Sequence, residues 1–176
     1  MKLVLSHIHA RFRQLRNGEV ADNLAAQGVR YRLAWGVESY RLKAIADEVR
    51  AAIAEEDKLK AIAEYLLNED VRESRMLATR LYPVGMMTKE DAEQWAENIV
   101  YTEQADQACM NLFAKVPFAK ELVERWISCN DIRLYMALQI ALRLNMTDDR
   151  ILQRAKKIVE EASFPIWIRS MANNLL

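Results

Sequence analysis

Apolar residues recur along most of the chain at the three- and four-residue spacing of an α-helix. Between residues 59 and 67, for example, Leu59, Ile62, Ala63, Leu66 and Leu67 share one helical face, with charged residues between them. Only four Gly and three Pro interrupt the 176 residues, which leaves strands few places to turn. The pattern therefore predicts an all-α protein.

Start and stop signals divide this pattern into about ten or eleven helices. Thr88-x-x-Asp91 has the form of a capping box, Pro117 and Pro165 suit first turns, and Asn17-Gly18 and Gly28 indicate helix ends. The segment from Pro83 to Gly85 is expected to be a loop. The predicted helices cover residues 3–16, 20–27, 39–51, 56–68, 70–82, 89–100, 103–115, 117–128, 131–144, 148–162 and 164–175.

These helices pair off with a repeat of about 30 to 40 residues, the period of HEAT and armadillo repeats. The spacing favours an α-solenoid of HEAT/armadillo-like helical hairpins. A non-repetitive helical bundle obeys the same packing rules and stays open as an alternative. Because 176 residues can form one sizeable core, we expect a single domain over residues 1–176.

Composition and the N-terminal sequence indicate the cellular compartment that we expect for the protein. Cys109 and Cys129 both lie in apolar helical patterns and read as small buried residues. The N-terminus has neither a long apolar segment nor a small-residue cleavage site, and no apolar run approaches the roughly 18 to 20 residues that span a bilayer. We expect a cytoplasmic protein with no membrane partner.

The net charge is zero, which argues against a generic polyanion binder. The charge is unevenly distributed, however. Residues 1–50 carry nine Lys and Arg against five Asp and Glu, residues 51–130 carry nine against fifteen, and residues 131–176 carry seven against five. Basic surfaces are therefore expected at the two ends of the chain, if these charges are more than ordinary solvated helix faces.

Common motifs for nucleotide or metal chemistry do not occur. The chain has no phosphate-binding glycine loop and no HExxH. His7 and His9 have no Cys near them in sequence, so we expect surface or packing roles, with no metal and no cofactor. Of the four Trp residues, at least three are expected in the core, because each lies among apolar neighbours.

One carboxylate is unusual in its context. Asp106 lies between apolar positions of a predicted helix that continues through Leu112 and Phe113. A carboxylate on a packed face needs a hydrogen-bond or charged partner, or it has a functional role.

The order of several segments resembles the HEAT-like DNA alkylation repair family, the AlkD-type alkylpurine DNA glycosylases. The matching segments are Trp35-Gly36-Val37, Leu42-Lys43-x-Ile45-Ala46, residues 72–78, residues 95–99, Ala105-Asp106-Gln107 and Leu112-Phe113. The resemblance implies a curved solenoid that grips duplex DNA on its concave face. It also implies removal of cationic N3- and N7-alkylated purines, without base flipping, by one aspartate and flanking tryptophans.

The resemblance assigns a catalytic role to Asp106, which stands where the family has its aspartate. The family's first pocket tryptophan falls at Tyr101 or Thr102, and the second falls near Asn173. An alkylated purine is already cationic, so a carboxylate near the developing oxocarbenium sugar supplies the electrostatic stabilisation that excision needs.

The expected partner is thus duplex DNA, possibly alkylated. The residues predicted to bind it are Tyr101, Arg133, Arg143, Arg154, Lys156 and Lys157, of which the cations would contact phosphates. The alternative is a non-catalytic HEAT-like scaffold that binds a protein or peptide on its concave face. The zero net charge and the changed pocket aromatics favour this second hypothesis.

Overall fold

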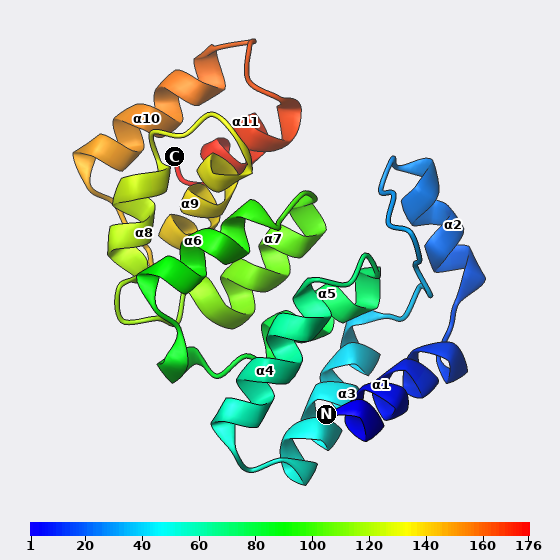
Figure 1. The fold of residues 1–176 in the computed structure, drawn as a ribbon. Coiled ribbons are helices and arrows are strands. Elements are labelled where there is room, and N and C mark those ends of the chain that lie inside the picture. The colour runs from blue at the N-terminus through cyan, green and yellow to red at the C-terminus, as the bar shows by residue number, and fades with distance from the viewer. The chain divides into compact units, whose positions relative to one another are not determined.

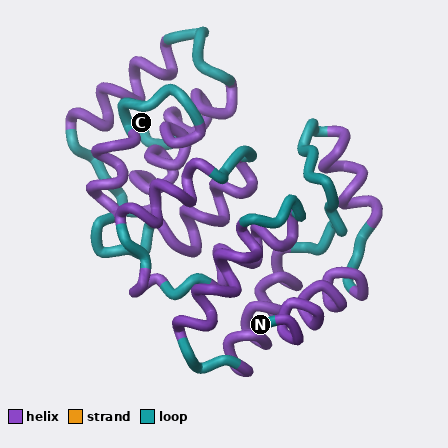
Figure 2. Tube along the Cα trace, viewed as in Figure 1, coloured by secondary structure: helices purple, strands orange, loops and turns teal.

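The computed structural model describes all 176 residues, and they form helices joined by loops, the connection from residue 27 to residue 38 being long (Figure 1, Figure 2). There are eleven α-helices, and the only β contact is an isolated bridge between Leu33 and Val71. The all-α prediction is confirmed. No helix has the length and apolar character needed to cross a lipid bilayer.

The chain divides into two compact units, residues 1–87 (unit 1) and 88–176 (unit 2). The expected single domain over residues 1–176 stays a prediction.

Unit 1 is organised around its last helix, α5. This helix packs against α3 and α4, and α1 packs on α3. Nearly all of α5 is buried, including the apolar residues Met76, Leu77 and Leu81. The helices are α1 (Lys2–Gln14), α2 (Gly18–Ala26), α3 (Ser39–Ala52), α4 (Glu56–Leu67) and α5 (Arg72–Leu81), followed by the 3-10 turn η1 (Val84–Met86).

A buried carboxylate attaches the loop before α3 to α5. Glu73 is fully buried and accepts hydrogen bonds from the backbone N–H groups of Trp35 (2.9 Å) and Val37 (3.2 Å). The Arg72 guanidinium donates to the same carboxylate (2.9 Å) and to the Val37 carbonyl (3.0 Å). Because the donors satisfy the buried charge, the loop is held in one conformation.

The Asn17-Gly18 pair begins a helix and does not end one. The Asn17 side chain accepts a hydrogen bond from the Val20 N–H (3.3 Å) and caps α2. The neighbouring loop passes so close that a Cβ at Gly36 would lie 2.0 Å from the Asn17 carbonyl oxygen. Gly36 also has a φ of +72°, so both space and backbone conformation require glycine there. Gly28, with a φ of +84°, follows α2 closely, as expected of a helix end.

Unit 2 is organised around α9. This helix contacts α7, α8, α11 and a π-helical turn, and all its residues from Leu134 to Ala141 are buried. A helix that is buried on all sides along its central residues is typical of such a position. The elements are α6 (Lys89–Glu97), α7 (Thr102–Ala108), the π-turn η2 (Cys109–Phe113), α8 (Ala119–Trp126), α9 (Ile132–Arg143), α10 (Asp149–Glu160) and α11 (Ile166–Asn173).

Local signals predicted some boundaries well and missed others. The capping box of Thr88 and Asp91 is present and opens α6. The helix predicted over residues 103–115 is interrupted: α7 ends at Ala108 and the chain widens into the π-turn, a feature that is often found at functional sites. The segment from Pro83 to Gly85, expected as a loop, contains the 3-10 turn.

The tryptophans are less buried than expected. Trp95 and Trp126 are core residues, and the Trp126 indole N–H donates to both carboxylate oxygens of Glu93 (3.0 and 3.1 Å). Trp35 is half-buried and Trp167 is 37% exposed. The prediction of at least three core tryptophans is therefore wrong. Trp167 lies outside the core because Ile168 and Ala172, four residues apart, form the packed face of α11.

The histidines and cysteines have ordinary packing roles. His7 is exposed, and His9 Nε2 lies 2.9 Å from Glu69 Oε2. Cys109 is fully buried, as predicted, whereas Cys129 is only half-buried.

Candidate active site

Asp106 is half-buried on α7, with its side chain directed at the central helix α9. Its Oδ1 atom accepts one hydrogen bond from the Tyr135 hydroxyl (2.8 Å) and one from the Gln139 amide (2.6 Å). The Gln139 amide also donates to the Tyr135 hydroxyl oxygen (3.2 Å). The three side chains form a closed triangle of hydrogen bonds.

The Asp106 carboxylate makes no ion pair. Both donors are neutral side chains, and they reach the same oxygen, so Oδ2 has no hydrogen-bond donor from the chain. Arg143, one turn beyond Gln139 on α9, is exposed and acts on the carboxylate only as a nearby positive charge. When Asp106 is ionised, its negative charge is offset at a distance by Arg143 and is not neutralised by a direct ion pair.

Burial is the main influence on the ionisation of Asp106. It raises the pKa of Asp106 above the usual aspartate value, and the negative charge of Glu103 adds to the rise. The Tyr135 hydroxyl, the Arg143 charge and the Gln139 amide oppose it. Burial likewise raises the pKa of Tyr135 to about 12, so the phenol keeps its proton at neutral pH and can donate to Asp106.

An exposed aromatic ring from a third helix lies beside this triangle. The Trp167 ring of α11 packs edge-on against Tyr135, with the ring centroids 5.3 Å apart and the planes at 71°. The site thus combines α7, α9 and α11 of unit 2. The resemblance placed the family's second pocket tryptophan near Asn173, at the exposed end of the same helix, where this chain has no aromatic residue, and it did not point to Trp167.

The polar residues of α9 could have been noticed in the sequence. Tyr135, Gln139 and Arg143 are spaced by four, so they lie in one row along a helix whose other central residues are apolar. A row of polar residues on a buried helix indicates a polar feature opposite it.

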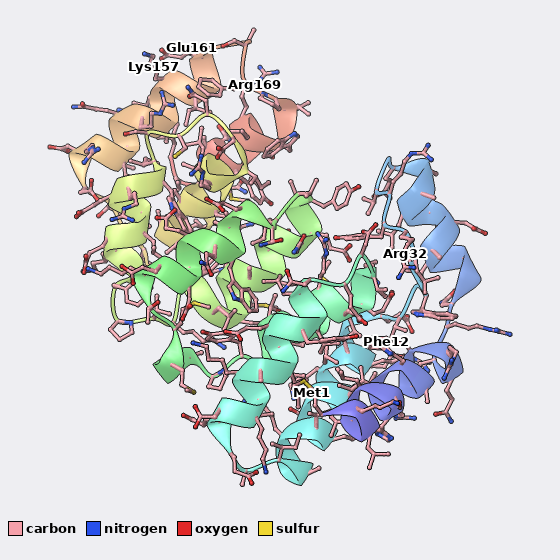
Figure 3. All side chains as sticks on the ribbon, viewed as in Figure 1. Met1, Phe12, Arg32, Lys157, Glu161 and Arg169 are labelled. Atoms are coloured by element: carbon pink, nitrogen blue, oxygen red, sulfur yellow. The ribbon has the colours of Figure 1, made fainter.

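The other residues predicted to bind nucleic acid do not contact Asp106. Arg133 pairs with Asp131 (2.6 Å), and Lys157 pairs with Glu161 (3.6 Å; Figure 3). Arg154 donates to the Ile127 carbonyl and to the Asn130 side chain, both at 3.2 Å. Lys156 is exposed, and Tyr101 is the half-buried N-cap residue of α7. Their nucleic-acid contacts stay predictions.

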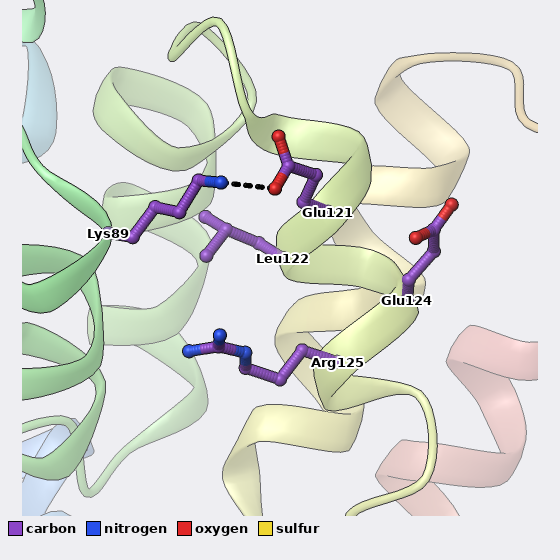
Figure 4. A pocket seen from close by; sticks show the side chains of 5 residues that line it. All are labelled: Lys89, Glu121, Leu122, Glu124 and Arg125. Carbon is purple, nitrogen blue, oxygen red and sulfur yellow. Dashed lines mark hydrogen bonds and ion pairs between the residues drawn. The ribbon is translucent and has the colours of Figure 1, made fainter.

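Three cavities of the molecule do not include Asp106 in their lining. One in unit 2, of about 390 Å³, is lined by Lys89, Glu121, Leu122, Glu124 and Arg125 (Figure 4). Its two cations are already paired, Lys89 with Glu121 and Arg125 with Glu93. No group of three or more His, Cys, Asp or Glu side chains is arranged to hold a metal ion.

Comparisons with known proteins place this geometry in context. The family model described as DNA alkylation repair enzyme matches residues 8–164. A solved structure from "a new family of proteins related to the HEAT-like repeat DNA glycosylases with affinity for branched DNA structures" matches 97% of this chain and 73% of its own, with a TM-score of 0.77. At 15% identity this likeness concerns the fold, and it confirms the HEAT-like prediction. No curated protein matches the chain.

Proposed function

Because the chain belongs to the DNA alkylation repair enzyme family, we propose that it binds duplex DNA and presents Asp106 to a cationic, N3- or N7-alkylated purine nucleotide. The observation that carries the proposal is the state of Asp106. Its carboxylate is half-buried, held by two neutral donors and not neutralised by an ion pair. Such a group attracts a cation more strongly than an exposed or paired carboxylate does.

Glycosidic bond cleavage is the reaction that suits this carboxylate. An alkylated purine carries a positive charge and leaves readily with the electron pair of the glycosidic bond. The sugar then carries positive charge until a water molecule adds to it and loses a proton. A fixed carboxylate beside that sugar stabilises the charge as it develops. No separate general acid is needed for a leaving group that is already cationic.

Two neighbouring side chains supply plausible DNA contacts in this proposal. Arg143 is exposed on the same row of α9 as Gln139, and we assign it to a phosphate next to the target nucleotide. We assign the exposed Trp167 ring, which lies beside Tyr135, the role of the family's second pocket tryptophan, which the resemblance places near Asn173. Its exposed surface is available to pack against a sugar or base.

The proposal is tested by release of 7-methylguanine and 3-methyladenine from methylated duplex DNA. We expect release above the no-enzyme background, and a loss of about 100-fold in Asp106→Asn, since removing a single group that stabilises transition-state charge has about this effect. Asp57→Asn, the same change at an exposed position of unit 1, is the matched control and is expected to keep full activity. Release no faster than background at enzyme excess would rule out excision.

DNA binding without excision has its own test. The similar solved structure comes from proteins with affinity for branched DNA structures. A four-way junction and a linear duplex of equal length are compared as ligands. Tighter binding to the junction, together with no excision, would favour recognition of DNA shape over recognition of a lesion.

A protein-interaction scaffold is the second candidate, and one feature of unit 1 favours it. Two cavities of about 320 and 400 Å³ share the lining residues Val4, Ala52 and Ile53, and Leu3 beside them is 87% exposed. Apolar surface of this kind is typical of protein contacts. This candidate gains weight only if the wild-type protein binds neither duplex nor junction. The cytoplasmic location stays a prediction in either case.

A further inference from the structure

Two polar groups, the Tyr135 hydroxyl and the Gln139 amide, are buried on the otherwise apolar central part of α9. Tyr135 and Gln139 are only 6% and 7% exposed, on a helix whose neighbouring positions are Leu134, Met136 and Leu138. Burying a hydroxyl or an amide costs free energy unless it forms hydrogen bonds. Both side chains direct their donors to Asp106, so their presence in the core is explained by that residue.

The arrangement restrains the carboxylate at one oxygen. Tyr135 and Gln139 both donate to Oδ1, and the bond between them fixes each donor relative to the other. Donors that are linked in this way polarise and support one another. A carboxylate fixed at Oδ1 has a defined orientation, and its second oxygen, Oδ2, remains without a donor.

We propose that Tyr135 and Gln139 are positioning residues for Asp106, which hold Oδ1 and thereby present Oδ2 to the cationic nucleotide. This inference rests on the proposed function, because it names the residues that would make Asp106 effective. A carboxylate that must stabilise a developing charge has to be oriented before the reaction begins.

Neighbouring residues hold the hydrogen-bonded triangle of Asp106, Tyr135 and Gln139 in place. The Tyr135 ring is packed edge-on against Trp167 of α11. On the other side, the Cys109 thiol, three residues after Asp106, lies 3.7 Å from the Met136 carbonyl oxygen and forms a weak contact between η2 and α9. Helices α7, α9 and α11 are thus linked at the level of the triangle.

The hydrogen bonds from Tyr135 and Gln139 also influence the ionisation of Asp106. The titratable and charged groups facing Asp106 are Tyr135 and Arg143 from α9, Glu103 from α7 and Cys109 from η2. Burial and Glu103 raise the pKa of Asp106, whereas the two donors and Arg143 lower it. Loss of either donor is therefore expected to raise the pKa of Asp106 further.

The first test measures this pKa without DNA. Carbon-13 NMR titration of the aspartate carboxyls is carried out on wild type, Tyr135→Phe and Gln139→Met, with the Asp106 signal assigned from Asp106→Asn. We expect the pKa of Asp106 to rise in both variants. Tyr82→Phe, which removes another buried tyrosine hydroxyl in unit 1, should leave it unchanged. An unchanged pKa in both folded variants would overturn the inference.

A second substitution at residue 139 keeps the inference testable if Gln139→Met does not fold. Gln139→Glu keeps the size of the side chain but places a second carboxyl beside Asp106, so it should also raise the pKa of Asp106. If it does not, the contact between residues 139 and 106 has no electrostatic role.

The second test separates positioning from simple stability. Excision by Tyr135→Phe at pH 6 is expected to be about tenfold slower than by wild type, as for loss of one hydrogen bond to a charged group. The deficit should appear in kcat with KM little changed, and it should persist at higher pH, because a misoriented carboxylate stabilises the sugar charge poorly even when it is ionised. A deficit that disappears at higher pH would mean that the Tyr135 hydroxyl affects only the ionisation of Asp106, and it would contradict a positioning role. If wild type itself does not excise, the proposed function fails, whereas the NMR titration still decides the positioning role.

Discussion

Two carboxylates of this protein show how surroundings separate structural from functional residues. Glu73 is fully buried, pairs with Arg72 and accepts two backbone N–H groups, so its lone pairs are used within the fold. Asp106 is half-buried, has no ion pair and keeps one oxygen free. The first pattern attaches a loop. The second leaves a charge available to a ligand, at some expense in stability.

Because the half-buried charge of Asp106 lowers the stability of the fold, the effect of Asp106→Asn on stability can be predicted. The folded state raises the pKa of Asp106, so the wild type loses stability as the pH rises from the ordinary aspartate pKa through the folded-state value. The amide carbonyl can accept the same two hydrogen bonds without carrying the charge. We expect Asp106→Asn to be at least as stable as wild type at pH 7.

The measurement is urea unfolding of both proteins at pH 7 and pH 4. The advantage of the variant should shrink at the lower pH, because a larger fraction of wild-type Asp106 is protonated there. A clearly less stable variant at pH 7 would show that the charge supports the fold, which is the opposite of our interpretation.

At the scale of elements, α5 and α9 play parallel roles. Each is the most buried helix of its unit, and each carries polar residues that form hydrogen bonds to another segment. On α5, Arg72 and Glu73 bind the loop around Trp35. On α9, Tyr135 and Gln139 bind Asp106. A central helix is the most rigid place from which to fix a loop or a side chain.

Replacing Glu73 should therefore disrupt unit 1. Glu73→Ala leaves the Arg72 charge buried and removes the acceptor of two loop N–H groups, so we expect a loss of about 3 to 5 kcal/mol in the free energy of unfolding. The control is Lys43→Ala, which breaks the exposed pair with Asp47 and should cost no more than about 0.5 kcal/mol. Thermal and urea unfolding check both. A similar small loss in the two variants would mean that the buried pair contributes little.

At the scale of the whole molecule, charge limits the kinds of DNA contact that the proposal allows. The chain has 25 basic and 25 acidic side chains, so binding cannot depend on a general positive field. It would depend on local contacts such as Arg143, whose side chain is exposed near Asp106.

Salt dependence of DNA binding tests this. Affinity for duplex DNA should fall with increasing salt, and Arg143→Gln should lower the slope of log K against log salt by about 0.9, the effect of one phosphate contact. Arg41→Gln, at a position paired with Glu38 in unit 1, is the control and should leave the slope unchanged. An Arg143→Gln slope equal to that of wild type would remove Arg143 from the contact surface.

Much of the local structure followed from short-range patterns. Helical spacing predicted eleven helices, and Thr88 and Asp91 predicted the start of α6. The errors were also local: Asn17-Gly18 opens a helix, and residues 109–113 widen into a π-turn. A Gly beside a capping residue can mark either end of a helix, and π-hydrogen bonding has no distinct apolar period, so neither outcome was readable from the pattern.

The sequence by itself determined the all-helical fold, the position of Asp106 on a packed helix and the need of that carboxylate for partners. Only the tertiary structure decided that the partners are Tyr135 and Gln139, 29 and 33 residues away, and that Trp167 lies beside them. The physical reason is that side-chain periodicity shows which face of a helix is buried. Side-chain periodicity does not show which other helix packs against that face. The chemistry of the site depends on that helix, because it supplies the hydrogen-bond donors to Asp106.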